Sequence, residues 1–218
     1  IKIVLQRYGI YLSTTTIHKY MNKDLNLSAI VMRKKPGYKS CKKHKIFDNL
    51  LKQKFNVDEK NKIWCTDFTY MRQPNGKFRY NCTIMDLFDR SAIASVNSDY
   101  INTELAIETL TEALKKEKPN NGILLHSDQG VQYTSWEFVN FCKDNGVIQS
   151  MSKAGCPYDN APMERFYNTF KNCFYYRYTF ESVEQLDEMT KQYINWYNYV
   201  RPHSTNNYMT PMEFRYRV

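Results

Sequence analysis

Three carboxylates occupy places where the surrounding sequence gives them little structural reason to be. Asp67 lies inside the strand-like stretch WCTDFTY, Asp128 directly follows the apolar run GILLH, and Glu164 lies in the helical stretch APMERFYNTFK. Aspartate is disfavoured inside strands. Carboxylate oxygens are the ligands that Mg²⁺ prefers, so three converging acids would suit a divalent cation. Glu164 taken alone is better explained as part of a solvated helix face.

The segments around these acids predict an α/β fold. Aromatic and branched stretches predict strands, and apolar residues at helical spacing predict helices. The strands are expected at 62–72, 77–88, 91–98, 122–126 and 147–151, and the helices at 103–117, 134–146, from 161, and 182–200. Asn102 is expected to cap the first of these helices, Thr134 and Glu137 form a capping box for the second, and QPNG is a hairpin turn.

A helical crossover makes strand 122–126 parallel to strand 62–72 if the two are neighbours. Asp67 and Asp128 would then open toward one side of the sheet, where ligand sites of such sheets gather. In the helix from Ala161, the 3.6-residue period turns Glu164 and Lys171 away from the buried face, about 10 Å apart. Asn160 precedes Glu164 by one turn. The buried face is expected to hold Met163, Phe166, Phe170, Cys173 and Phe174.

Composition limits the function classes. The chain has 218 residues, 42% of them hydrophobic, and a formal net charge of +9. That size suggests one domain with a small appendage. The charge favours nucleic acid as a partner and disfavours a glycosidase built on two carboxylates. The six cysteines lack a zinc-finger spacing and suggest buried free thiols in a reducing compartment.

The N-terminal quarter divides into two further segments. Residues 1–32 resemble the last helix of a helix-turn-helix, although a generic amphipathic helix fits equally well. Residues 33–57 are expected to form a basic linker, in which Lys34, Lys35, Lys42 and Lys43 either are solvated or contact DNA phosphates. Residues 58–218 form the expected core with its C-terminal helix and tail. The chain starts at Ile1, so we expect a fragment of a longer protein, and no apolar stretch suggests a membrane span.

The spacing of the acids resembles a known signature. Sixty residues separate Asp67 from Asp128, and 35 separate Asp128 from Glu164, as in the DD(35)E pattern of retroviral-type integrases and bacterial transposases. The strings WCTDFTY, HSDQGVQYTS, SMSKAGCPYDNAPMERFYNTFK and YNYVRPHSTNNYMTPMEF resemble the OrfB transposases of the IS3 family. The resemblance covers roughly residues 60–215, and more faintly 1–30. The integrase-type His/His/Cys/Cys zinc module is not found in the sequence.

The resemblance implies a ribonuclease H-like fold, with a five-stranded mixed sheet flanked by helices. It implies a DDE transposase that cleaves DNA and then joins the freed 3′-OH to another phosphodiester. Two Mg²⁺ ions, replaceable by Mn²⁺, are expected, with Asp67 bridging them and Asp128 and Glu164 completing one site each. Lys171 and Asn160 are expected to contact DNA. The implied partners are double-stranded transposon ends and target, further copies of the chain on DNA, and an upstream or fused helix-turn-helix region. A bacterial cytoplasmic, nucleoid-associated location follows.

Other polar residues leave alternatives open. His126 either orients a metal-bound water or phosphate or is packed structurally, and Asp86 is a candidate to support the acids. Asp89 is expected to pair with Arg90 or to stand in a turn. Arg201 and His203 match the family strings without a role that we can derive. Two other functions also fit the residues: a ribonuclease H-like nuclease that only hydrolyses, and a DNA-binding protein with an idle site.

Overall fold

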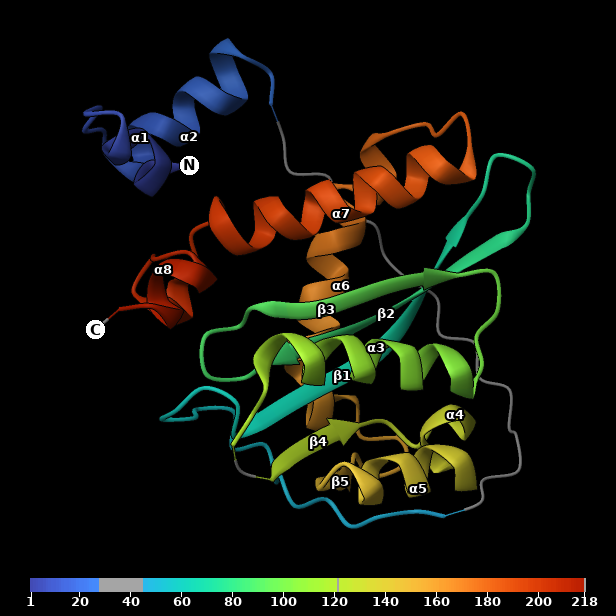
Figure 1. Ribbon diagram of the computed structural model, residues 1–218. Coiled ribbons are helices and arrows are strands. Elements are labelled where there is room, and N and C mark those ends of the chain that lie inside the picture. The colour runs from blue at the N-terminus through green and yellow to red at the C-terminus, as the bar shows by residue number, and fades with distance from the viewer. Residues whose placement is uncertain (28–44, 121, 218) are drawn as a thin grey trace.

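The computed structural model describes residues 1–27, 45–120 and 122–217. Its centre is a five-stranded mixed sheet with the order β3-β2-β1-β4-β5. The first three strands pair antiparallel, whereas β4 is parallel to β1 and β5 is parallel to β4 (Figure 1). The strands are β1 (Ile63–Arg72), β2 (Phe78–Asp86), β3 (Ala92–Ser98), β4 (Ile123–Ser127) and β5 (Val147–Met151). The predicted ribonuclease H-like arrangement is confirmed.

Local sequence signals explain how the strands connect. Gly76 closes the β1–β2 hairpin by donating to the Gln73 carbonyl at 2.9 Å, and its φ of +82° lies in the left-handed region that favours glycine. The helix α3 (Thr103–Glu117) begins where the Asn102 side chain accepts the Leu105 N–H at 3.1 Å, as predicted. This helix crosses over to β4 and thereby allows the parallel pairing with β1.

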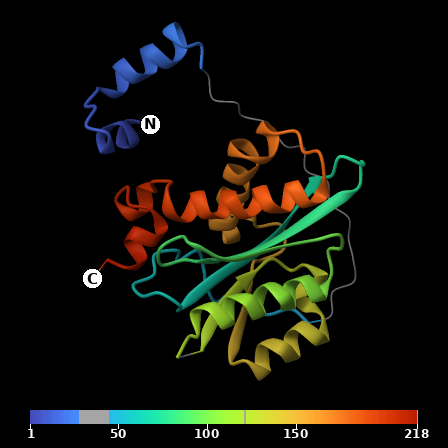
Figure 2. The ribbon, with the colours of Figure 1, turned by 45° about the horizontal axis from the view of Figure 1, so that its top comes forward.

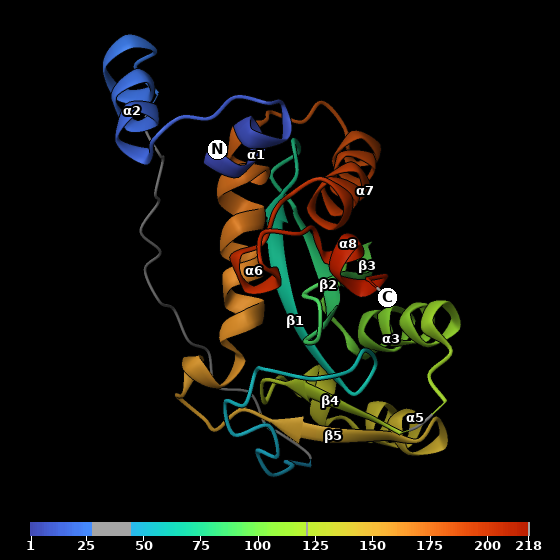
Figure 3. The same cartoon turned by 90° about the vertical axis from the view of Figure 1, so that its left-hand side faces the viewer.

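Helices cover both faces of the sheet (Figure 3). On one face, α6 (Ala161–Cys173) and α7 (Val183–Tyr199) bury an aromatic-rich core around Phe166, Phe170 and Tyr193. On the other face, α3 and α5 (Trp136–Asp144) bury Trp64 and Tyr133 among aliphatic residues. Within the described ranges, no helix combines the length and apolar character needed to cross a membrane.

The two N-terminal helices, α1 (Lys2–Arg7) and α2 (Thr14–Lys19), stand apart from the sheet (Figures 1 and 2). Ser13 caps α2 by accepting the Thr16 N–H. Arg7 connects this segment to the C-terminal helix α8 (Pro211–Arg215) through an ion pair of 2.9 Å with Glu213.

Two predictions about the helices are wrong. The helix predicted at 134–146 consists of a separate turn, α4 (Val131–Thr134), followed by α5, and the cap of α5 is Ser135, whose side chain accepts the Phe138 N–H. Cys173, which the helical period placed on the buried face of α6, is exposed, and Tyr167 is buried instead. The buried free thiols predicted from composition are present at Cys65, Cys82 and Cys142, and burial raises the pKa of Cys82 to about 11.

Residues 33–44 of the predicted basic linker, including Lys34, Lys35, Lys42 and Lys43, lie outside the described residues. From Lys45 onward the chain runs along the sheet: the Lys45 N–H donates to the Thr134 carbonyl at 3.1 Å, and Leu51 is buried in the core under α6. The division at residues 32 and 57 stays a prediction.

Candidate active site

Strand register brings the first two acids together. The last pair between β1 and β4 is Cys65 with His126, and Asp67 and Asp128 each lie two residues beyond that pair on adjacent parallel strands. Asp67 is half-buried and Asp128 is exposed. One oxygen of each carboxylate is oriented by the backbone: Asp67 Oδ1 accepts the Phe68 N–H, and Asp128 Oδ1 accepts the Gly130 N–H, both at 2.8 Å.

Gly130 allows the Asp128 carboxylate to lie this close to the turn. A Cβ atom at position 130 would lie 2.9 Å from Asp128 Oδ1, closer than such atoms come in real structures. Gly130 therefore leaves space for the acid.

The third acid is carried by a helix that is hydrogen-bonded to β1. Asn160, at the start of α6, donates its Nδ2 to the Thr66 carbonyl at 3.1 Å, and the Tyr167 hydroxyl donates to the Asp67 carbonyl at 2.9 Å. Glu164 lies between these two residues, one turn from each, on the same stripe of the helix. Figure 3 shows α6 running alongside β1. The structure thus brings the exposed Glu164 to the strand that carries Asp67.

Lys171 continues the same stripe. Its ammonium nitrogen lies 4.2 Å from the centroid of the Tyr70 ring, three residues beyond Asp67 on β1. The prediction that the polar stripe of α6 faces away from the protein is wrong at Asn160, which is buried against β1. Asn160 Oδ1 is buried and has no hydrogen-bond partner among the residues that the structure describes.

Tyr167 is a residue that the sequence interpretation did not single out. Its hydroxyl also lies 3.2 Å from the Asn81 carbonyl and 3.0 Å from Asn81 Oδ1, so it joins α6 to β2 as well as to β1. Burial raises the pKa of Tyr167, which keeps the phenol protonated as a donor. Its position among aromatic residues gave no sign of this role.

His126 has the structural role that was one of its two alternatives. Its ring nitrogens lie 2.9 Å from Ser150 Oγ and 3.1 Å from Ser152 Oγ, so the ring connects β4 to the strand β5 and the residue after it. Burial lowers the pKa of His126 to about 4, which leaves the ring neutral at pH 7.

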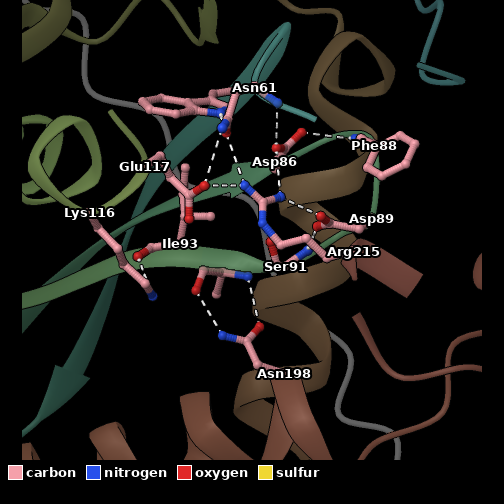
Figure 4. A network of polar contacts seen from close by, with 12 residues as sticks. Asn61, Asp86, Phe88, Asp89, Ser91, Ile93, Lys116, Glu117, Asn198 and Arg215 are labelled. Carbon is pink, nitrogen blue, oxygen red and sulfur yellow. Dashed lines mark hydrogen bonds and ion pairs between the residues drawn. The ribbon is translucent and has the colours of Figure 1, made fainter. Parts of the chain in front are cut away.

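Asp86 belongs to a different polar cluster, around Arg215 of α8 (Figure 4). Arg215 forms ion pairs with Asp86, at 2.9 Å, and with Asp89 and Glu117, and it also donates to Asn61. Asp86 pairs with Trp64 across the sheet, whereas Asp67 pairs with Thr83, three residues away on β2. This placement gives Asp86 a structural role instead of the expected support of the acids. Asp89 stands in the turn after β2, the second of its two predicted roles, and it pairs with Arg215, not with Arg90.

The donor chemistry of Asp67, Asp128 and Glu164 fits a hard divalent cation, because all three supply carboxylate oxygens. In the part of the chain that the structure describes, no group of three His, Cys, Asp or Glu side chains is arranged to hold a metal ion. The role of the three acids as metal ligands therefore stays a prediction.

A five-stranded mixed sheet with Asp67 inside β1 and Asp128 directly after β4 is the arrangement of an integrase core domain. The chain matches models of the integrase core domain at residues 57–157 and again at 145–211. It is 35% identical to the transposase for insertion sequence element IS904 of Lactococcus lactis over 76% of this chain and 66% of that protein. It is also 35% identical to an uncharacterized transposase-like protein of Haemophilus influenzae over 78% of each chain. The chain belongs to the IS3-type family of insertion-sequence transposases.

A solved structure shares the fold. The catalytic core domain of HTLV-2 integrase, determined in complex with magnesium, matches with a TM-score of 0.59 at 16% identity, over 72% of this chain and 98% of that one. The chain spans just under two thirds of the length of the Lactococcus relative and 59% of the length of the putative IS150 transposase of Escherichia coli.

Proposed function

We propose that this chain cuts DNA strands at the ends of an insertion sequence and joins them to target DNA, with Asp67, Asp128 and Glu164 as the catalytic acids. The observation that carries the proposal is the arrangement of these residues. Asp67 and Asp128 each lie two residues beyond the last pair of β1 with β4, and hydrogen bonds to the carbonyls of Thr66 and Asp67 hold the helix of Glu164 against β1.

The proposed cofactor is Mg²⁺, two ions per site, with Mn²⁺ as a substitute. The HTLV-2 integrase core of the same fold was determined with magnesium. Asp67, Asp128 and Glu164 would hold the ions, which when bound activate a nucleophile and stabilise the leaving oxygen of a phosphodiester. The protein's own contribution is orientation: backbone N–H groups fix the carboxylates of Asp67 and Asp128, and Asn160 and Tyr167 fix the helix that presents Glu164.

Charge supports a DNA substrate. The formal net charge is +9, and Lys171 stands on the stripe of α6 that carries Glu164, about 10 Å further along. An ammonium at that distance suits a phosphate next to the one being cut. The proposed partners are double-stranded transposon ends and target, further copies of this chain assembled on DNA, and a helix-turn-helix region supplied upstream or in fusion. The proposed location is the bacterial nucleoid in the cytoplasm.

The test is a strand-cleavage assay. Purified protein is incubated with labelled end-containing DNA, with and without Mg²⁺, and products are separated on a denaturing gel. Cleaved and joined products are expected only with the metal, and Asp67→Asn, Asp128→Asn and Glu164→Gln are each expected to abolish both. Asp144→Asn, which changes an exposed carboxylate at the end of α5, is the matched control and should retain activity.

Each other outcome contradicts the proposal in a recognisable way. Cleavage without joined products would indicate a nuclease that only hydrolyses. Binding without cleavage would indicate an idle DNA-binding protein. Near-normal cleavage by one of the three variants would remove that residue from the set of ligands.

A further inference from the structure

A group of large aromatic side chains is exposed on the β1–β2 hairpin, just beyond the acids. Tyr70 is 48% exposed and Phe78 is 46% exposed. Their ring centroids are 5.4 Å apart with an interplanar angle of 81°, and the half-buried Tyr80 lies 6.4 Å from Phe78. We call these three residues the hairpin aromatic patch. Exposed apolar groups of this kind indicate a binding surface when they cluster.

The β1–β2 hairpin carries the patch, and its end projects past α3 (Figure 1). The Arg72 N–H donates to the Tyr175 hydroxyl at 2.6 Å, which fastens the hairpin to the segment after α6. The aromatic rings are therefore held on a supported hairpin.

Positive charge accompanies the rings. The Lys171 ammonium lies 4.2 Å from the Tyr70 ring centroid, and the exposed Arg72 follows two residues later on the same strand. Aromatic faces that stack on bases, combined with cations that meet phosphates, are the means by which proteins bind single-stranded nucleic acid. A paired duplex keeps its base faces stacked on one another, so this chemistry favours unpaired bases.

The position relative to the acids fixes which part of the DNA would reach the patch. Tyr70 lies three residues beyond Asp67 along β1, about 10 Å, and its side chain leaves the opposite face of the sheet. A strand running from the acids would reach it by passing Lys171 of α6, which contacts the Tyr70 ring. Lys171 lies seven residues beyond Glu164 along α6, also about 10 Å. Because β4 pairs with β1 only as far as Cys65, the β4-side edge of β1 is left without a strand partner at Asp67 and Tyr70. At the rise of about 3.4 Å per nucleotide of a stacked strand, and more for an extended single strand, the patch is within roughly three nucleotides of the acids.

We propose that the hairpin aromatic patch binds unpaired bases of the DNA strand within roughly three nucleotides of the phosphodiester held at the acids. The inference rests on the proposed function, because it takes its ligand from the DNA on which the acids act. It adds that this DNA has a single-stranded stretch next to the cleavage point, held by stacking on Tyr70 and Phe78.

The test compares two DNA molecules in the presence of a chelator, so that it depends on no catalytic step. One is a labelled blunt duplex, and the other is the same duplex with a three-nucleotide single-stranded end. Fluorescence anisotropy should show tighter binding of the second. The double change Tyr70→Ala with Phe78→Ala should weaken binding of the single-stranded end roughly tenfold or more, and should change binding of the blunt duplex less than about twofold. Tyr70→Trp should retain binding because it keeps an aromatic face.

Tyr216→Ala is the matched control. Tyr216 is a tyrosine 66% exposed near the C-terminus, and the Lys60 ammonium lies 5.7 Å from its ring, so the control also removes an exposed ring beside a lysine. A fluorescent adenine analogue in the single-stranded end gives a second readout, since stacking on the patch should quench it in the wild type and not in the double variant.

Three results would overturn the inference: equal weakening of both DNA molecules, no weakening of either, or an equal effect of Tyr216→Ala. A change in the oligomeric mass of the DNA-free double variant, with preference for the single-stranded end retained, would show instead that the patch joins copies of the chain. Failure of strand cleavage with this binding pattern intact would contradict the proposed function and leave the patch assignment standing.

Discussion

Replacing Arg215 by Met should destabilise the fold strongly, although the residue lies far from the acids. The Arg215 side chain is 1% exposed, and the Asp86 and Asp89 side chains that it pairs with are fully buried. The change leaves three carboxylates, including that of Glu117, without their shared cation (Figure 4). Removing one partner of a buried ion pair costs about 3–5 kcal/mol. For a domain of this size, that corresponds to a Tm lower by about 6–20 °C.

The loss of stability in Arg215→Met should depend on pH in a definite direction. Burial, reinforced by the neighbouring Asp89 carboxylate, already raises the pKa of Asp86 in the wild type. Without Arg215 the pKa of Asp86 should rise further. A carboxyl group whose pKa is raised by folding contributes stability that is complete below its unfolded pKa, about 3.9, and is lost as pH rises through its folded pKa. The deficit of Arg215→Met should therefore be largest near pH 7 and should shrink as pH falls toward 4.

The assay is urea unfolding of both proteins at pH 7 and pH 5. Arg7→Met is the matched control, because it removes an arginine from the partly exposed ion pair with Glu213 and should cost at most about 1 kcal/mol. The reasoning is refuted if Arg215→Met costs less than about 1 kcal/mol at pH 7, or if its deficit stays constant or grows as the solution is acidified.

Three further predictions concern the proposed active site. Tyr167→Phe keeps the ring but removes the hydroxyl that bonds the Asp67 carbonyl. It should raise the Mg²⁺ concentration needed for cleavage and lower the free energy of unfolding by about 0.5–1.5 kcal/mol. The control is Tyr193→Phe, which removes a buried hydroxyl with no partner among the described residues. An unchanged Mg²⁺ requirement in Tyr167→Phe would contradict its positioning role. Lys171→Ala should lower the DNA affinity measured by anisotropy and the strand joining measured on gels. It should leave Mn²⁺ binding, measured by calorimetry, unchanged. Unaltered DNA affinity would mean that Lys171 is only a surface charge. Changing Lys34, Lys35, Lys42 and Lys43 to Gln should flatten the log-log salt dependence of DNA binding by roughly 0.9 per lost phosphate contact, and an unchanged slope would mean that these lysines are only solvated.

Most of the fold followed from local sequence patterns. The strand stretches, the hairpin at QPNG and the cap at Asn102 each depend on residues within a few positions of one another, so the sequence displayed them directly. The parallel pairing of β1 with β4 followed from the helical crossover. The start of α5 was misplaced by one residue because Thr134 and Ser135 are both good caps, and only the backbone of the α4 turn decides between them.

The polar clusters were harder to predict from the sequence. Asp86 and Arg215 are 129 residues apart, and no local pattern relates them. Asp86 therefore looked like a rival to the catalytic acids until the position of α8 gave it a partner. Tyr167 was equally hidden, since a tyrosine between two phenylalanines on the buried face of a helix predicts packing, and its hydroxyl bonds become visible only when β1 and β2 are in place.

The hydrogen bonds between α6 and β1 explain how a helix 94 residues downstream of its strand partner can position Glu164, a proposed catalytic acid. Consecutive carbonyls of a strand point to opposite edges, and α6 bonds to two of them in succession, Thr66 through Asn160 and Asp67 through Tyr167. Bonds on both edges oppose rotation of the helix about the strand as well as sliding along it. Because these contacts use backbone carbonyls, they are insensitive to the side chains of β1. The position of Glu164 is therefore tied to the strand that carries Asp67, whereas Asp128 depends on the turn at Gly130.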